Sequence, residues 1–391
     1  MSGLKNKLPP SSKSFHHFEK KSIIGLENIS NTLNRIEERL DSQRSFYERR
    51  LSELENNQEI LKKQIYYYSE ASMNDDKKSD FQMRCELFRR LPDATGVIRI
   101  SQLATVKLMS ELDSILRKNN IDYWFGYGSL LGAFIRKGPL PWDDDIDICL
   151  HRENLKKLIE ILEHDDTYQI TIVYDWYVKC IQYRFCPKNV KIPVFIDIGV
   201  WDYGVKRTDE NEEKVQRIRF ELMEELDRLK LPYWESRGVL PKPGSGFARQ
   251  IGDDVFLEEW KDYNDKKIEK ETSLIQNVFD KYVEKAKRNG LIVSRDKANS
   301  YIYSFDNLTI PNRRMIYEKK MIEPTIKIKY DRLSVSCPHD PKAFLDTCYN
   351  AWPYLPHDSS ILGCSHSNSM LFRRPDIQEE IHKFIGKPLI K

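Results

Sequence analysis

One stretch constrains the fold more than any other part of the chain. It runs from residue 123 to residue 148 and reads YWFGYGSLLGAFIRKGPLPWDDDIDI. The aromatic run predicts a short strand over 122–126, and the Gly-Ser pair that follows predicts the start of a helix that continues through Ile135. A second strand is predicted over 145–150. The chain therefore turns from strand to helix and back to strand within a few residues, and four aspartates at 143–147 lie at the second strand.

The spacing of the aspartates predicts a metal site. Side chains alternate along a strand, so Asp145 and Asp147 point to one face, roughly 6.6 Å apart along the chain, while Ile146 and Ile148 face the core. Asp143 shares their face if the strand begins early. Crowded carboxylates resist desolvation and raise one another's pKa, and a divalent cation removes that cost. Hard oxygen ligands favour Mg²⁺ or Mn²⁺.

The neighbouring residues are typical of a phosphate-binding corner. The backbone N–H groups of Gly128 and Ser129 at a helix start suit a phosphate oxygen, and Arg136 and Lys137 follow one to two turns later. In a later apolar strand, over 192–200, Asp197 is the single acid. A strand, a Gly-Ser turn, a helix, an Asp-x-Asp strand and a later acid resemble the polymerase-β-like nucleotidyltransferase fold.

Three blocks carry a more specific resemblance. They are GSLLGAFIR at 128–136, PWDDDIDI at 141–148 and FIDIGVWD at 195–202. These blocks are similar to the LicD family, which includes the fukutin-like ribitol-phosphate transferases. A weaker match over 324–357 resembles the closing segment of that family, so the resemblance covers roughly 97–357.

The resemblance implies the transfer of a phosphorylated alcohol to a cell-surface glycan. The donor would be a CDP-alcohol such as CDP-choline, the acceptor a sugar hydroxyl of a glycan or glycolipid of the lipopolysaccharide, capsule or teichoic acid type, and CMP would be released. Asp145 and Asp147 match the metal-binding pair of the family, Asp143 the acid before it and Asp197 the acid of the later strand. The three metal ligands expected are Asp145, Asp147 and Asp197.

Catalytic roles follow from this chemistry. Phosphoryl-type transfer depends mainly on positioning and charge neutralisation. A second ion or a proton acceptor would use Asp197 or Asp143 to activate the acceptor hydroxyl. We expect Arg136 and Arg184 to hold phosphate oxygens, and Tyr127, Trp142 or Trp124 to stack on the cytosine ring or contact a trimethylammonium group. The structural alternatives are a hydrogen-bonded strand residue for Asp197, a surface ion pair for Arg184 and core packing for the aromatic residues.

The same residues are also consistent with other functions. A nucleotidyltransferase that attaches NMP to a small molecule or protein would use the same aspartates and release pyrophosphate. A catalytically inactive oligomeric scaffold is the third class. Six cysteines and histidines, Cys337, His339, Cys348, His357, Cys364 and His366, lie within thirty residues, but their irregular spacing favours buried thiols over a zinc site.

The N-terminal part predicts a separate helix. Apolar residues at Leu26, Ile29, Leu33, Ile36, Leu40, Tyr47, Leu54 and Leu61 follow a heptad spacing, interrupted by polar residues at 43, 50 and 57. We expect a coiled coil that makes the protein a homo-oligomer through residues 26–68. A single amphipathic helix that packs on the body is the alternative.

The whole chain is divided accordingly. We predict a basic flexible tail over 1–25, a coiled-coil helix over 26–70, a linker over 71–95, a nucleotidyltransferase-like core over 96–205 and a helical, irregular C-terminal part over 206–391, in the α+β class. A formal charge of only +3 argues against nucleic-acid binding. The absence of an apolar leader and of long apolar runs predicts a cytoplasmic protein. The basic tail favours a solvated segment, with contact to the inner face of an anionic membrane as the alternative.

Overall fold

The structure is a computed structural model of the chain. It describes residues 77–243, 265–308, 314–349, 352 and 374–386, together with separated positions between 29 and 54. The chain divides into two units, Met1–Glu59 and Ile60–Lys391. The predicted tail over 1–25 lies outside the described residues, so its contact with a membrane stays a prediction. Within the part of the chain that the structure describes, no helix combines the length and apolar character that a membrane span needs.

The first unit is helical at its described positions between 29 and 54, where the heptad pattern predicts a helix. Its apolar side chains are 48–62% exposed, namely Ile29, Leu33, Ile36, Leu40, Tyr47, Leu51 and Leu54. A helix with such an uncovered stripe gains stability when a partner buries it. Association through this helix stays a prediction.

The second unit is built on a mixed sheet. Its strands run in the order β1 (Trp124–Phe125), β2 (Asp147–His151), β5 (Ile196–Gly204), β4 (Cys180–Pro187), β3 (Tyr168–Asp175) and β6 (Val239–Pro241), and β7 (Ser300–Tyr303) pairs both β5 and β8 (Ile316–Glu318). β2 and β5 are parallel, and the other pairs are antiparallel. The expected α+β class agrees with this arrangement.

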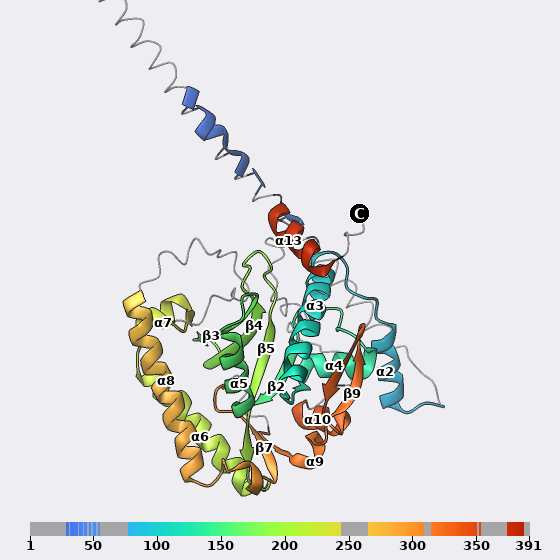
Figure 1. The fold of residues 1–391 in the computed structure, drawn as a ribbon, viewed down its shortest axis with the longest axis vertical. Helices are drawn as coiled ribbons and strands as arrows, with labels where there is room; N and C mark the ends of the chain where they lie inside the picture. Colours follow the sequence, from blue (N-terminus) through green and yellow to red (C-terminus); the bar gives the residue numbers. More distant parts are fainter. Residues whose placement is uncertain are drawn as a thin grey trace, which may run out of the picture. The chain divides into compact units, whose positions relative to one another are not determined.

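Helices surround the sheet (Figure 1). They are α2 (Asp80–Arg90), α3 (Gly96–Lys118), α4 (Tyr127–Arg136), α5 (Arg152–Leu162), α6 (Asp209–Arg228), α7 (Pro232–Arg237), α8 (Asp265–Arg288), α9 (Lys319–Ile322), α10 (Pro341–Cys348) and α13 (Pro375–Ile385). α4 packs on β2, α5 packs on β2, β3 and β5, and α6 lies beside α8 (Figure 1). The strands expected over 122–126, 145–150 and 192–200, and the helix expected to continue through Ile135, occur within a few residues of their predicted bounds.

Part of the predicted linker over 71–95 is a helix. Ser79 caps α2 through its hydroxyl, which accepts from the Gln82 N–H, and the Gln82 side chain accepts from the Ser79 N–H in return. Leu87 and Phe88 are buried against the body. The polar composition of residues 71–80 therefore does not extend to the segment that follows.

The C-terminal part is more regular than expected. Residues beyond 205 supply β6, β7 and β8 to the main sheet, and β9 (Ile326–Tyr330) and β10 (Leu333–Cys337) form an antiparallel hairpin. Glu212 on α6 anchors β8 because its carboxylate accepts from the N–H groups of Met315 and Ile316. The hairpin packs against α4 and β1, which brings residues far along the chain to the Asp-rich segment.

Candidate functional site

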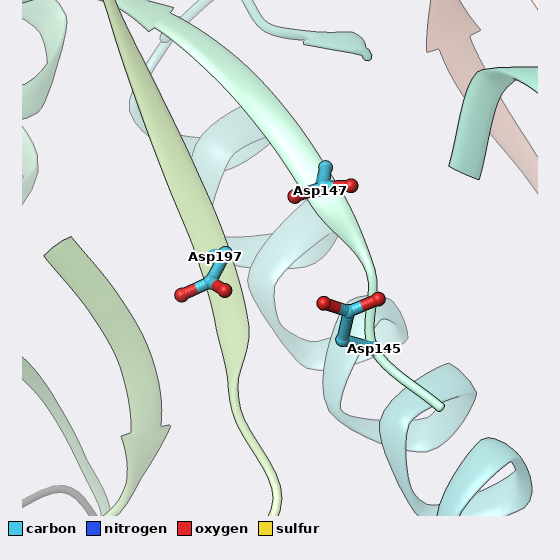
Figure 2. Close-up of side chains that lie close together, drawn as sticks. All are labelled: Asp145, Asp147 and Asp197. Atoms are coloured by element: carbon cyan, nitrogen blue, oxygen red, sulfur yellow. The ribbon is translucent and has the colours of Figure 1, made fainter. Parts of the chain in front are cut away.

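Three carboxylates converge where β2 and β5 begin. Asp147 opens β2, Asp145 lies just before it, and Asp197 stands opposite Asp147 in the parallel pair (Figure 2). One oxygen from each carboxylate lies within 4.8 Å of the others. Asp145 is buried, and Asp147 and Asp197 are half-buried. The sequence predicted that Asp145 and Asp147 lie on one face of the strand, and the register of β2 against β5 brings Asp197 next to them.

The geometry fits a divalent cation. Two oxygens bound to one Mg²⁺ lie roughly 3–4 Å apart, because each is about 2.1 Å from the ion. The three carboxylate oxygens lie within 4.8 Å of one another, so they need to move only slightly closer together to bind one ion. The donor set is all carboxylate, which suits Mg²⁺ or Mn²⁺ better than soft metals.

The backbone of the Asp-rich segment is held from two helices. The Ser129 hydroxyl on α4 accepts from the Asp147 N–H at 2.7 Å. On α3, the Gln102 amide donates to the carbonyls of Leu140 and Asp143, at 2.9 and 2.7 Å. These contacts fix the loop before any ligand binds, so the carboxylates are preorganised.

Sequence reasoning missed the residues of α3 that do this. Ser101 and Thr105 add hydroxyl bonds to the Asp144 carbonyl, at 3.5 and 3.3 Å. Both side chains are buried, as is Gln102. Three polar residues on the buried side of an otherwise apolar helix were the available signal, because buried polar groups need partners. Ser129 itself, expected to hold phosphate, holds the backbone of β2.

Asp143 lies at the first turn of α4. A Cβ at Gly128 would meet Asp143 Oδ2 at 2.7 Å, so the carboxyl group fills the space beside this glycine. Burial raises the pKa of Asp143 well above its usual value, and Asp145, with which it shares a hydrogen bond, raises it further. The structure thus places the acid against the Gly128 position where a phosphate oxygen was expected.

Arg184 faces the acid cluster from β4. It is paired across the strands with Asp197, and its Nε donates to Asp197 Oδ1 at 3.0 Å. The guanidinium is 1% exposed and lies 4.1 Å above the Phe195 ring. The expected surface alternative for Arg184 is therefore wrong, and the contact makes it a positioning residue for Asp197.

Tyr330 is a further residue that sequence reasoning missed. It ends β9, is fully buried and packs edge-on against Phe125 with ring centroids 5.0 Å apart. Burial raises the pKa of Tyr330, and the charges of Asp143 and Asp145 raise it further. The IKIKY sequence of β9 carries no motif that could have indicated this placement.

Arg136 is engaged elsewhere. Its guanidinium donates to the carbonyls of Phe88 and Leu91, at 2.5 and 2.6 Å, and to Asp93 at 3.0 Å. The side chain is 6% exposed. These contacts tie the end of α2 to the end of α4, because the carbonyls after a helix end need donors. Phosphate binding by Arg136 is not supported.

Two of the three aromatic candidates belong to the core. Trp124 is fully buried and stacks with Tyr301 at 6.1 Å, and the ring of Tyr127 contacts Tyr303 and Phe344. Both rings pack against other aromatic side chains, and neither lies in the acid cluster, so base stacking at the aspartates by Trp124 and Tyr127 is not supported. Trp142 is half-buried and remains the aromatic candidate.

The Cys and His group lies partly outside the described residues. His357, Cys364 and His366 are among the residues not described. Cys337 and Cys348 are buried, as the default interpretation predicted.

Comparisons with known proteins agree with this site. Residues 120–189 match the family model described as LicD/FKTN/FKRP, nucleotidyltransferase domain. The match includes Asp143, Asp145, Asp147 and Arg184, and it ends before Asp197. The predicted resemblance to the LicD family is confirmed over residues 120–189, which match the model of its nucleotidyltransferase domain.

Individual relatives cover only part of the chain. The lipopolysaccharide cholinephosphotransferase LicD of Haemophilus influenzae is 29% identical over 148 residues, which are 35% of this chain and 53% of that protein. A protein of unknown function from Rickettsia prowazekii is 35% identical over 94 residues, 24% of this chain and 33% of the relative. The chain thus spans about half the length, or less, of these relatives.

Proposed function

We propose that this protein transfers a phosphorylated alcohol, such as phosphocholine, from a CDP-alcohol to a sugar hydroxyl of a cell-surface glycan of the lipopolysaccharide type. The observation that carries this proposal is the convergence of Asp145, Asp147 and Asp197 at one end of a parallel strand pair. The family match over 120–189 and the partial similarity to a lipopolysaccharide cholinephosphotransferase support the choice of reaction.

In this proposal, Asp145, Asp147 and Asp197 hold Mg²⁺ or Mn²⁺. The bound ion would neutralise the diphosphate of the donor and stabilise the departing CMP. Arg184 keeps Asp197 in place through its 3.0 Å hydrogen bond. A carboxylate of the cluster, Asp143 or Asp197, takes the proton of the acceptor hydroxyl. The reaction would proceed in the cytoplasm.

The first experiment is product analysis. The purified chain is incubated with Mg²⁺ and CDP-choline, CDP-ribitol or CDP-glycerol, and CMP is measured by mass spectrometry. With water in place of the sugar hydroxyl as acceptor, we expect slow release of CMP and the phospho-alcohol from at least one donor. We expect Asp147→Asn to retain less than about a tenth of the rate, a loss of at least roughly 1.4 kcal/mol. Asp166→Asn, an exposed acid outside the cluster, is the control.

Two results would contradict the proposal. If the protein cleaves nucleoside triphosphates with release of pyrophosphate and leaves every CDP-alcohol intact, the nucleotidyltransferase alternative is correct. If Asp147→Asn and Asp166→Asn behave alike in CMP release, the three acids are not the catalytic centre.

We further propose that the N-terminal helix joins copies of this chain. The exposed apolar stripe that includes Leu33, Ile36 and Leu40 is the supporting observation. A double change, Leu33→Glu with Leu40→Glu, should convert the oligomer to a monomer in light scattering after size-exclusion chromatography. A wild-type protein that is monomeric would refute this assignment.

A further inference from the structure

A separate cavity lies away from the acids. It has a volume of about 1040 Å³ and opens where β2 and β5 end, whereas the acids lie where these strands begin. His151, the last residue of β2, and Lys206, just after β5, both line it. The carboxyl ends of parallel strands commonly form ligand-binding crevices.

Basic side chains from three separate segments meet at this cavity. Its lining contains five basic residues, Lys206, Arg207, Arg295, Lys319 and Lys320, and three acidic residues, Asp122, Glu318 and Glu323, a net charge of +2. The site of the three aspartates is acidic by contrast. A cavity that gathers cations from loops far apart in sequence favours an anionic ligand.

Most of these cations are loosely paired. Arg295 lies 3.7 Å from Glu153, and Lys319 lies 3.6 Å from Glu323, both longer than a charge-assisted hydrogen bond. Arg207 lies 3.8 Å from Glu212, and no ion pair of Lys206 is found among the described residues. The closest pair on the rim joins Lys320 to Glu318 at 2.8 Å, between exposed side chains. Exposed pairs of this kind contribute little energy, so an anion can compete for the cations.

The deeper lining is aromatic and incompletely hydrogen-bonded. His151 is 4% exposed, stacks on Tyr203 with ring centroids 4.4 Å apart, and its Nδ1 has no hydrogen-bond partner among the described residues. The Nε1 of Trp124 likewise has no hydrogen-bond partner among the described residues. Buried nitrogens without partners are unusual and need an explanation. Asn299 and Ser300 add polar groups to the same lining.

We propose that this cavity binds a phosphorylated sugar. Lys206, Arg207 and Lys320 would hold the phosphate, and the aromatic and polar lining around His151 would hold the sugar ring. The volume is that of a small-molecule pocket and is much larger than a phosphate ion needs. This site does not depend on the proposed transferase activity, because none of its lining residues belongs to the acid cluster.

The test is calorimetric titration of the full chain with glucose 6-phosphate, glucose and inorganic phosphate as separate probes. We expect glucose 6-phosphate to bind at least tenfold more tightly than either part. The double variant Lys206→Ala with Lys320→Ala should weaken binding by tenfold or more. The matched control removes two exposed lysines of α6 and α8, Lys214→Ala with Lys281→Ala, and should bind as the wild type does.

Each contrary result is decisive. Equal weakening in both double variants would mean that net charge alone attracts the sugar phosphate. Equal affinity for phosphate and for glucose 6-phosphate would refute the sugar site. Absence of binding by a wild-type protein with a cooperative thermal transition would refute the whole proposal. Asp147→Asn should leave this affinity unchanged, which separates the cavity from the metal centre.

Discussion

Replacing Gly128 by alanine tests how tightly the acid cluster is built. The added methyl would lie 2.7 Å from Asp143 Oδ2 and 3.6 Å from its Cγ. Ordinary contacts of a methyl group begin at about 3.5 Å, so the carboxyl group has to move by about 1 Å. Asp143 cannot move alone, because it is hydrogen-bonded to Asp145 and its carbonyl accepts from Gln102.

The expected cost follows from this crowding. Overpacking of a buried site costs typically about 1–3 kcal/mol of folding free energy. A displacement of about 1 Å at reacting groups lowers rates by about 100-fold, which corresponds to roughly 2.7 kcal/mol. We expect Gly128→Ala to lose both stability and the greater part of CMP release.

Gly199→Ala is the matched control. It lies on β5, two residues beyond Asp197, and its added methyl would meet the Ile148 carbonyl oxygen at 3.6 Å and the Tyr127 ring at 3.7 Å. These are ordinary contacts. Thermal unfolding, Mn²⁺ binding by electron paramagnetic resonance and CMP release are compared for the two variants. If Gly128→Ala matches Gly199→Ala in all three measurements, the inferred position of Asp143 is wrong.

Three further predictions concern charge. Burial lowers the pKa of His151 from 6.5 to about 4, so in this range the unfolded chain binds a proton that the folded chain does not, and folding stability is lost as pH falls from about 6.5 to about 4. Between about pH 7.5 and about pH 5, urea unfolding of the wild type should show a loss of folding free energy about 2 kcal/mol larger than that of His151→Phe. Equal losses in the two proteins would exclude the effect. Arg184→Met should lower the free energy of unfolding by about 3–5 kcal/mol, because it removes the ion-pair partner of Asp197. Arg99→Met, at a half-exposed ion pair, should lower it by about 1 kcal/mol or less. Denaturant titration of both variants measures the difference. Mg²⁺ at a hundredfold excess over its dissociation constant should stabilise the wild type by about 2.7 kcal/mol and should not stabilise Asp197→Asn, which a thermal scan with and without the ion measures.

The acids were predictable because their signal is local. Strand alternation places Asp145 and Asp147 on one face, and an isolated acid in the apolar segment around Asp197 indicated a third ligand. The contact between them depends on the parallel register of β2 and β5, in which Asp147 faces Asp197. That register forms across distant segments, so the sequence supported it only through the family resemblance.

The supporting residues were not predictable in the same way. In the local sequence, Arg136 stands where a phosphate-binding residue is expected, yet its partners are carbonyls at the end of α2. That helix was not predicted, because the polar segment before it indicated a linker. Tyr330 packs against Phe125 because the hairpin of β9 and β10 lies on α4 and β1. Both placements are tertiary contacts with no periodic signal in the chain.

In the acid cluster, the charged side chains differ from the side chains that hold their backbone in place. The acids of the cluster resist being brought together, and neutral side-chain groups, the Ser129 hydroxyl and the Gln102 amide, hold the backbone that carries them. The Arg184 guanidinium adds a charged hydrogen bond to Asp197. A neutral scaffold leaves the cluster with a net negative charge, which favours binding of a divalent ion. A change at Gln102 should therefore disturb the position of the acids without altering their charge, whereas a change at Asp197 should alter the charge and leave the loop in place.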